Sequence, residues 1–204
     1  FGLGLTLPSA VGLFMLPTAL IALLFEHGAF DRQSTLITAP VLAAFAIGLP
    51  SFVLIKIFQP SFYAREDMRT PMWFSAINAI LNIVLSLILF PQIGVVGLAI
   101  ATSIAGWVNA ILLGGTLYWR NLFRISSATL RNVALIVLAC GVMIGILYAG
   151  KQWIGADLLD GGFFLRLGYI MALIAVSASV YLAMVVATGA ISKDQLKQLR
   201  RRNN

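Results

Sequence analysis

Acidic and redox-active side chains are scarce in this sequence. Its 204 residues include seven Asp and Glu, one His and one Cys. All seven carboxylates fall at the ends of long apolar runs, in short connections or in the tail, so no carboxylate pair is available inside a run for acid and base chemistry. One His and one Cys leave no His/Cys metal cluster or Cys/His dyad, and neither a GxSxG elbow nor a P-loop occurs. The sequence therefore predicts no enzyme.

Charge of either sign is also sparse, whereas long apolar runs are abundant. Only 10% of the residues are charged and 60% are hydrophobic, while soluble domains carry about 25% charged residues. The runs reach the roughly twenty residues that a helix needs to cross a hydrocarbon core. We predict an all-α, polytopic helical membrane protein with six transmembrane helices, over Leu5–Phe25, Thr38–Ala64, Pro71–Phe90, Val95–Trp119, Asn132–Gly150 and Leu165–Ala190.

The net charge of +7 comes from basic residues that lie between the runs and in the tail. This distribution is typical of cytoplasmic loops, so we do not expect nucleic acid as a partner. Arg65 and Arg69, the connection after Trp119 and the tail hold most of the Lys and Arg. They predict that the C-terminus is cytoplasmic.

Prolines divide the chain, because all seven lie at or before Pro91. Pro17 and Pro50 are deep enough in their runs to bend a helix, and bent helices indicate a cavity or moving parts. We expect four helices of a core lobe in residues 1–119, a cytoplasmic connection in 120–131, an accessory helix pair in 132–190 and a basic cytoplasmic tail in 191–204. Gly141 and Gly145 form a GxxxG pattern that predicts close packing of the accessory pair.

Lys56 is a cation deep inside a predicted span, about two turns before its end. An ammonium group at that depth either faces a wet cavity or extends to the headgroups. The sequence leaves both interpretations open: a contact for an anionic substrate, or a snorkelling residue.

Amides and hydroxyls are concentrated in the third and fourth spans. Asn78 and Asn82 are one turn apart and share a helix face. With Thr102, Ser103 and Asn109 they form either an interhelical hydrogen-bond network, which we favour, or oxygen ligands for a small cation such as Na⁺. Asn78, Asn82 and Thr102 are the candidate ligands.

Two stretches resemble signatures of a known family. Residues 24–31, LFEHGAFD, are similar to "LFERGAFD", and residues 60–71, PSFYAREDMRTP, are similar to "FYARxDxxTP". Both signatures are those of the MurJ (MviN) family of lipid II flippases, within the multidrug/oligosaccharidyl-lipid/polysaccharide exporter superfamily. The resemblance covers the whole chain and implies that it is the last six of fourteen helices, with four in a transporter lobe. His27 stands where the first signature has Arg.

The resemblance also implies a function. Lipid II would be flipped from the cytoplasmic to the outer leaflet of the bacterial inner membrane by alternating access, for cell wall synthesis. Lys56 would line the cavity, and Arg65 and Arg69 would steer the phosphates at its cytoplasmic mouth. No cofactor is expected, with Na⁺ or proton coupling through the membrane potential left open. The expected partners are lipid II, membrane lipids and the missing N-terminal helices of the same protein.

Three alternatives stay open at this point. The chain could serve a flippase for another polyprenyl-linked glycan, a cation-coupled multidrug exporter, or a non-transporting membrane scaffold for cell-wall enzymes. The second signature favours lipid II.

Overall fold

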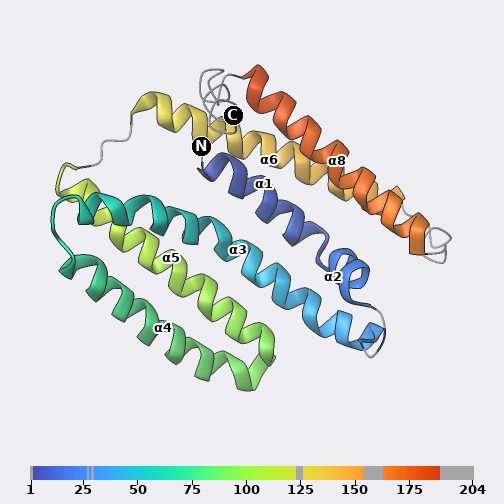
Figure 1. Ribbon diagram of the computed structural model, residues 1–204, viewed down its shortest axis with the longest axis horizontal. Helices are drawn as coiled ribbons and strands as arrows, with labels where there is room; N and C mark the ends of the chain where they lie inside the picture. The colour runs from blue at the N-terminus through green and yellow to red at the C-terminus, as the bar shows by residue number, and fades with distance from the viewer. Residues whose placement is uncertain (1, 27, 29, 123–125, 154–162, 189–204) are drawn as a thin grey trace, which may run out of the picture. The chain divides into compact units, whose positions relative to one another are not determined.

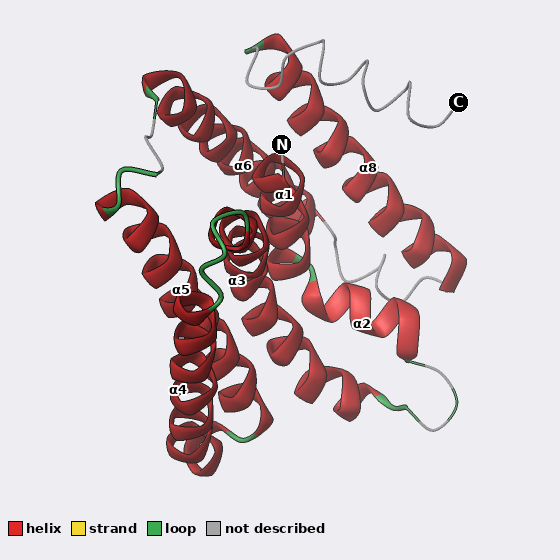
Figure 2. Cartoon of the chain, turned by 60° about the vertical axis from the view of Figure 1, so that its left-hand side comes forward, coloured by secondary structure: helices red, strands yellow, loops and turns green. Residues whose placement is uncertain are grey.

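The regular secondary structure of the described residues is helical, and turns and loops join the helices. The computed structural model describes the backbone of residues 2–26, 28, 30–122, 126–153 and 163–188, and these residues form helices and no strand (Figures 1 and 2). The helices are α1 (Gly2–Met15), α2 (Pro17–Phe25), α3 (Arg32–Tyr63), α4 (Arg69–Ile93), α5 (Val95–Trp119), α6 (Ser127–Trp153) and α8 (Phe163–Ala187). The predicted all-α class is confirmed.

The helices group into two compact units. One unit, His27–Arg124, contains α3, α4 and α5, and we call it the α3–α5 unit. The other combines Phe1–Glu26 with Ile125–Asn204 and contains α1, α2, α6 and α8, and we call it the α1/α6/α8 unit. The predicted lobe and accessory pair, divided at residues 120–131, concern a larger transporter and stay a prediction. The predicted tail lies outside the described residues.

Among the described residues, five helices are long and apolar enough to cross a membrane, and α1 with α2 makes a sixth span if the two count together. The first predicted span is not one straight helix. It breaks at Leu16, and α1 and α2 meet at 80°. Pro17 is the first residue of α2, a position where its missing N–H and fixed φ are tolerated. The expected bend at Pro17 is therefore a complete break.

The second predicted span begins earlier than expected. α3 starts at Arg32, because the Asp31 carboxylate accepts a hydrogen bond of 2.8 Å from the Ser34 backbone N–H. This bond, together with a second one from the Ser34 hydroxyl, also lowers the pKa of Asp31. A side-chain oxygen at this position satisfies one of the free N–H groups at a helix start. The predicted start at Thr38 follows the beginning of the apolar run, and the cap places the start of the helix six residues earlier.

α3 runs through Pro40, Pro50 and Pro60 without interruption. Near Pro50, side chains of α5 bind its backbone: the Ser103 hydroxyl donates to the Ala44 carbonyl at 2.7 Å, and the Trp107 indole N–H donates to the Ile47 carbonyl at 3.0 Å. Neither carbonyl is the one that Pro50 leaves without a helical donor, which is that of Ala46. These bonds therefore join α3 to α5 near Pro50 but do not replace the missing proline N–H.

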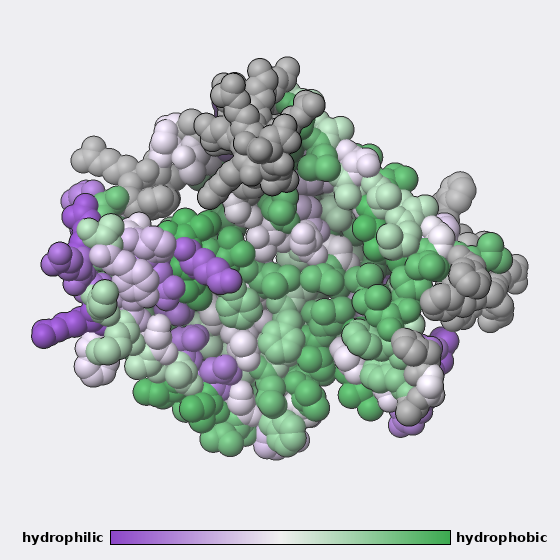
Figure 3. Space-filling model, in the orientation of Figure 1, coloured by the Kyte–Doolittle hydropathy of each residue, from purple (hydrophilic) through white to green (hydrophobic). Residues whose placement is uncertain are grey.

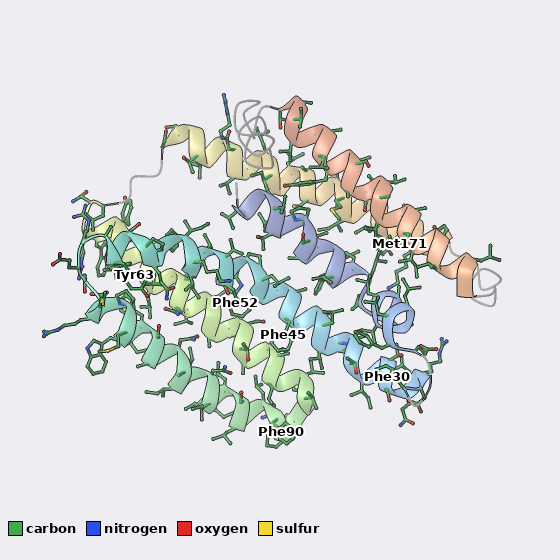
Figure 4. All side chains as sticks on the ribbon, in the orientation of Figure 1. Phe30, Phe45, Phe52, Tyr63, Phe90 and Met171 are labelled. Carbon is green, nitrogen blue, oxygen red and sulfur yellow. The ribbon has the colours of Figure 1, made fainter. Side chains whose placement is uncertain are left out.

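Small residues let α3, α4 and α5 approach closely. A Cβ atom placed on Gly48 would lie 2.5 Å from the Ser103 hydroxyl, and one on Gly106 would lie 2.8 Å from the ring of Phe52, which Figure 4 labels on α3. One on Gly97 would lie 2.8 Å from the Leu89 backbone. Close approach through glycine is a common basis for packing between membrane helices.

The α1/α6/α8 unit has a larger apolar core. The buried residues of its core cluster come from the α1–α2 junction, α6 and α8: Leu16, Ile136, Ala139, Cys140, Met143, Leu147, Tyr181 and Val185. The Tyr181 hydroxyl donates a hydrogen bond to the Gly4 carbonyl. In an α-helix that carbonyl would bind the N–H of residue 8, which is Pro8 and has none. Tyr181 therefore supplies the donor that the proline removes.

The GxxxG pattern is not used as predicted. No atom of the described structure lies within 4 Å of a Cβ placed on Gly141 or Gly145. The glycine of α6 that lies against α8 is Gly150, which contacts Leu173. The spacing of the two glycines identified a helix face of small residues, but it could not decide which face of α6 the partner helix covers.

Candidate functional site

Polar side chains gather at one end of the α3–α5 unit, where α3 ends, α4 begins and α5 ends. Figure 3 shows hydrophilic residues at this end, on the left of the view, beside helix surface that is mostly hydrophobic. We call it the arginine end and define it as residues 63–70 and 119–121. It includes two of the three substrate-contact residues expected from the sequence.

Two turns of the same kind build the arginine end. At the end of α3, Glu66 has φ 59° and the Asp67 N–H donates to the Phe62 carbonyl at 3.1 Å. At the end of α5, Asn121 has φ 55° and the Leu122 N–H donates to the Leu117 carbonyl at 3.0 Å. This left-handed residue with its reverse hydrogen bond is the Schellman ending of a helix. The chain therefore turns sharply at the end of α3 and again at the end of α5.

These turns bring Asp67 and Arg120 together. The Asp67 carboxylate accepts hydrogen bonds from the Thr70 N–H at 3.1 Å, the Thr70 hydroxyl at 2.8 Å and Nη1 of Arg120 at 2.6 Å. Nη2 of Arg120 also donates to the Thr70 hydroxyl at 3.3 Å, and the guanidinium lies 6.0 Å from the ring centre of Phe62. We call Asp67, Thr70 and Arg120 the Asp67 clasp.

The clasp changes the acidity of its carboxyl group. Hydrogen bonds from Arg120 and then from Thr70 lower the pKa of Asp67 to about 2, because they stabilise the ionised form. Asp67 is therefore a carboxylate throughout the physiological pH range. Since the pair is partly exposed to solvent, it fixes geometry more than it adds stability.

The predicted substrate residues keep their charges unpaired. Arg65 and Arg69 are exposed, and the side chain of neither makes a hydrogen bond or ion pair within the described part of the chain. Lys56 is likewise exposed and without a polar partner there. Its neighbours Ile55 and Phe58 pack toward α5, so Lys56 points away from that helix. Three cations are thus available to an anionic ligand, and their substrate role stays a prediction.

The predicted amide and hydroxyl network forms only in part. The Thr102 hydroxyl lies 3.4 Å from the Asn82 amide oxygen, which also accepts from Ser86 at 3.3 Å. The amide oxygens of Asn78 and Asn109 are buried without a hydrogen-bond partner in the described structure. Ser103 binds α3 instead, as described above. Asn82 and Thr102 therefore join α4 to α5, while Asn78 is not bonded to either.

No group of three or more His, Cys, Asp or Glu side chains among the described residues could hold a metal ion. Any cation at Asn78, Asn82 and Thr102 would depend on amide, hydroxyl and carbonyl oxygens, which suit hard cations. Whether a cation binds there stays a prediction.

Sequence reasoning missed the Asp67 clasp. Asp67 and Arg120 are 53 positions apart, and each had a simpler explanation as a loop charge. The available signal was the acidic residue inside the "FYARxDxxTP" match, three residues before Thr70. Asp31 gave a similar signal, since it ends the first match three residues before Ser34, although His27 and Ala29 of that match lie outside the described residues.

The apolar helices and their polar ends define an integral, polytopic helical membrane protein. Comparison with known proteins then identifies its family. The family model described as "Lipid II flippase MurJ" matches residues 1–169, and the chain belongs to the MurJ family. This confirms the resemblance drawn from the two signatures.

Individual relatives agree with the family match. The chain is 38% identical to "Probable lipid II flippase MurJ" of Rhizobium meliloti (strain 1021), over 97% of this chain and 37% of the relative. It is 33% identical to a protein of the same name from Vibrio cholerae, over 93% of this chain and 36% of the relative. It is 32% identical to "Lipid II flippase MurJ" of Burkholderia cenocepacia, over 91% and 36%. The chain thus spans little more than a third of these curated relatives.

Proposed function

We propose that this chain is part of a transporter, not an enzyme, that moves lipid II from the cytoplasmic to the outer leaflet by alternating access for cell wall synthesis. The observation that carries the proposal is the family match over residues 1–169. The names of the relatives, which specify lipid II, favour this substrate over another polyprenyl-linked glycan.

The physical problem of such transport is to pass a large headgroup with a pyrophosphate through hydrocarbon. Exposed cations in a wet cavity lower that cost, and rocking of two lobes changes which side the cavity faces. In this proposal Lys56 lines the cavity, while Arg65 and Arg69 steer the phosphates at its mouth. Their exposure and lack of partners support these roles.

The proposal includes an orientation. The protein resides in the bacterial inner membrane, with the arginine end and the C-terminus in the cytoplasm, because short basic connections are retained there. Its other partners are membrane lipids and the further helices that the longer relatives contain. No organic cofactor takes part.

Coupling to Na⁺ or to protons through the membrane potential completes the proposal. Asn78, Asn82 and Thr102 are the candidate Na⁺ ligands. The unpaired, buried oxygen of Asn78 and the contact between Thr102 and Asn82 support this assignment.

Complementation tests the proposal. The full-length protein encoded by the gene that contains this sequence is expressed in cells depleted of their own lipid II flippase, and exposure of lipid II on the outer leaflet is measured. We expect rescue by the wild type and its loss with Lys56→Ala. Lys151→Ala, which removes an exposed lysine from the last turn of α6, is the matched control.

Each outcome has a definite meaning. Rescue that Lys56→Ala abolishes at equal protein level, while Lys151→Ala retains it, supports both the substrate and the role of Lys56. Rescue unaffected by Lys56→Ala makes Lys56 a snorkelling residue. A well-inserted wild type that fails to rescue contradicts the lipid II assignment and favours another glycan or a scaffold.

A further inference from the structure

Two carboxylates, Glu66 and Asp67, lie between the unpaired arginines in the connection between α3 and α4. Arg65 and Arg69 each stand two residues from Asp67, and Glu66 lies between. A carboxylate so close in the chain is a natural partner for either arginine, since Arg and carboxylate groups pair readily. In the structure, however, Asp67 binds Arg120 from the end of α5, and Arg65 and Arg69 remain without partners.

We propose that Arg120 is a positioning residue that occupies Asp67 and so keeps Arg65 and Arg69 free to bind a lipid-linked diphosphate. This inference rests on the proposed function, because it concerns the same candidate substrate site. It assigns to Arg120 an indirect role, through the charge of Asp67, and not a contact with the ligand.

The geometry of the clasp supports this role. Both carboxylate oxygens of Asp67 are engaged: Oδ1 accepts from the Thr70 N–H, and Oδ2 accepts from the Thr70 hydroxyl and from Arg120. The guanidinium is held in turn by Thr70 and lies over the buried ring of Phe62. The low pKa of Asp67 is consistent with a carboxylate whose charge is already compensated.

The charge balance leads to the same expectation. At the arginine end, Arg65, Arg69 and Arg120 face two carboxylates, Glu66 and Asp67, so one positive charge is left over. Without Arg120 the balance is zero, and Asp67 competes with the ligand for the other two arginines. Glu66 is exposed and unpaired in the described structure, so it competes in either case.

A double-mutant cycle tests the inference. The full-length protein is placed in phosphatidylcholine nanodiscs, and binding of undecaprenyl pyrophosphate is titrated. We expect Arg120→Gln to weaken binding roughly three- to tenfold, as for the loss of one nearby favourable charge. Adding Asp67→Asn should restore binding to within about twofold of wild type, because the competing carboxylate is then absent. Arg120→Lys should bind nearly as wild type, since an ammonium also neutralises Asp67.

Matched variants separate this role from a structural one. Arg131→Gln removes an exposed arginine from α6 and should change binding less than about twofold. Glu66→Gln should tighten binding about twofold. A clasp that served only to hold the fold would make the double variant as weak as Arg120→Gln, or weaker, and its melting temperature lower. That result would overturn the inference.

Three further outcomes are informative. If the same pattern appears with phosphatidylglycerol nanodiscs but not with the diphosphate, the arginines bind bilayer headgroups and the inference is wrong. The inference is also wrong if the wild type does not bind the diphosphate. If the cycle behaves as expected but lipid II is not exposed in cells, the inference stands and the proposed function fails.

Discussion

The two units stabilise their proline-containing helices in different ways. In the α3–α5 unit, α3 passes three prolines without a break, and α5 binds it along its length through Ser103, Trp107 and close glycine contacts. In the α1/α6/α8 unit the chain breaks at Pro17, while the carbonyl opposite Pro8 is bound by Tyr181. A proline therefore does not by itself break a helix. Of the carbonyls four residues before a proline in α1 and α3, that of Gly4 receives a side-chain hydrogen bond in place of the missing proline N–H.

The largest effect that would sharpen this comparison concerns glycine. Gly97→Ala should destabilise the protein by about 1–3 kcal/mol, because the new Cβ would meet the Leu89 backbone, which cannot move aside easily. Gly141→Ala in α6 should be neutral or stabilising by up to about 1 kcal/mol, since nothing in the described structure lies near it. Unfolding in detergent followed by circular dichroism measures both, and equal effects would contradict the difference between the units.

Tyr181→Phe should have the next largest effect. It leaves the buried Gly4 carbonyl without a donor and should cost about 1–3 kcal/mol. Trp107→Phe should cost less, about 0.5–1.5 kcal/mol, because Ser51 retains the N–H that serves the Ile47 carbonyl in a regular helix. The same unfolding measurement ranks the two variants.

Pro8→Ala provides the control for Tyr181. With an N–H restored at position 8, the Gly4 carbonyl regains a helical donor, and Tyr181→Phe should then cost less than in the wild-type background. If the cost of Tyr181→Phe is the same in both backgrounds, the hydroxyl does not compensate for the proline.

A smaller effect is expected at Glu66, which has a left-handed backbone conformation. Glu66→Gly should stabilise the α3–α5 unit by about 0.5–1 kcal/mol, because glycine adopts this conformation without strain. Glu66→Ala should not, since alanine keeps the Cβ. Asn121→Gly should give less, because asparagine already tolerates this region. Denaturant unfolding of the three variants checks the order.

The smallest effect on stability should come from acid. The pKa of Asp67 is lowered from 3.8 to about 2 in the folded protein. Its contribution to stability is thus present above about pH 4 and is lost as pH falls through about 2. Titration of the Asp67 carboxyl carbon by NMR should give this pKa, and Arg120→Gln should move it upward. An unchanged pKa in that variant would show that Arg120 does not hold the carboxylate.

Parts of the fold followed directly from local sequence. The predicted span Val95–Trp119 has the same ends as α5, because Gly94 and Arg120 bound an uninterrupted apolar run. The start of α3 was missed by six residues, since hydropathy does not report a cap such as Asp31. The first predicted span is broken at Leu16. The sequence shows that Pro17 lacks an N–H donor, but it does not specify whether a helix continues through a proline, as α3 does, or breaks there.

In the candidate site, too, local features were predicted from the sequence and contacts between helices mostly were not. Lys56, Arg65 and Arg69 are exposed, and their role as cations for an anionic substrate stays a prediction. The contact between Asn82 and Thr102 was expected. The Asp67 clasp and the unpaired oxygen of Asn78 were not predicted, because both depend on which side chains of other helices lie opposite.

The sequence by itself determined the membrane class, the approximate limits of the long apolar helices, the family and the candidate cations, because hydropathy, helix ends and short motifs act within a few residues. Only the tertiary structure decided which carboxylate Arg120 neutralises, which carbonyl Tyr181 serves and which glycines are in contact. Those pairings join residues 53 and 177 positions apart. Buried polar groups must find partners wherever the fold places them, and spacing along the chain does not specify that place.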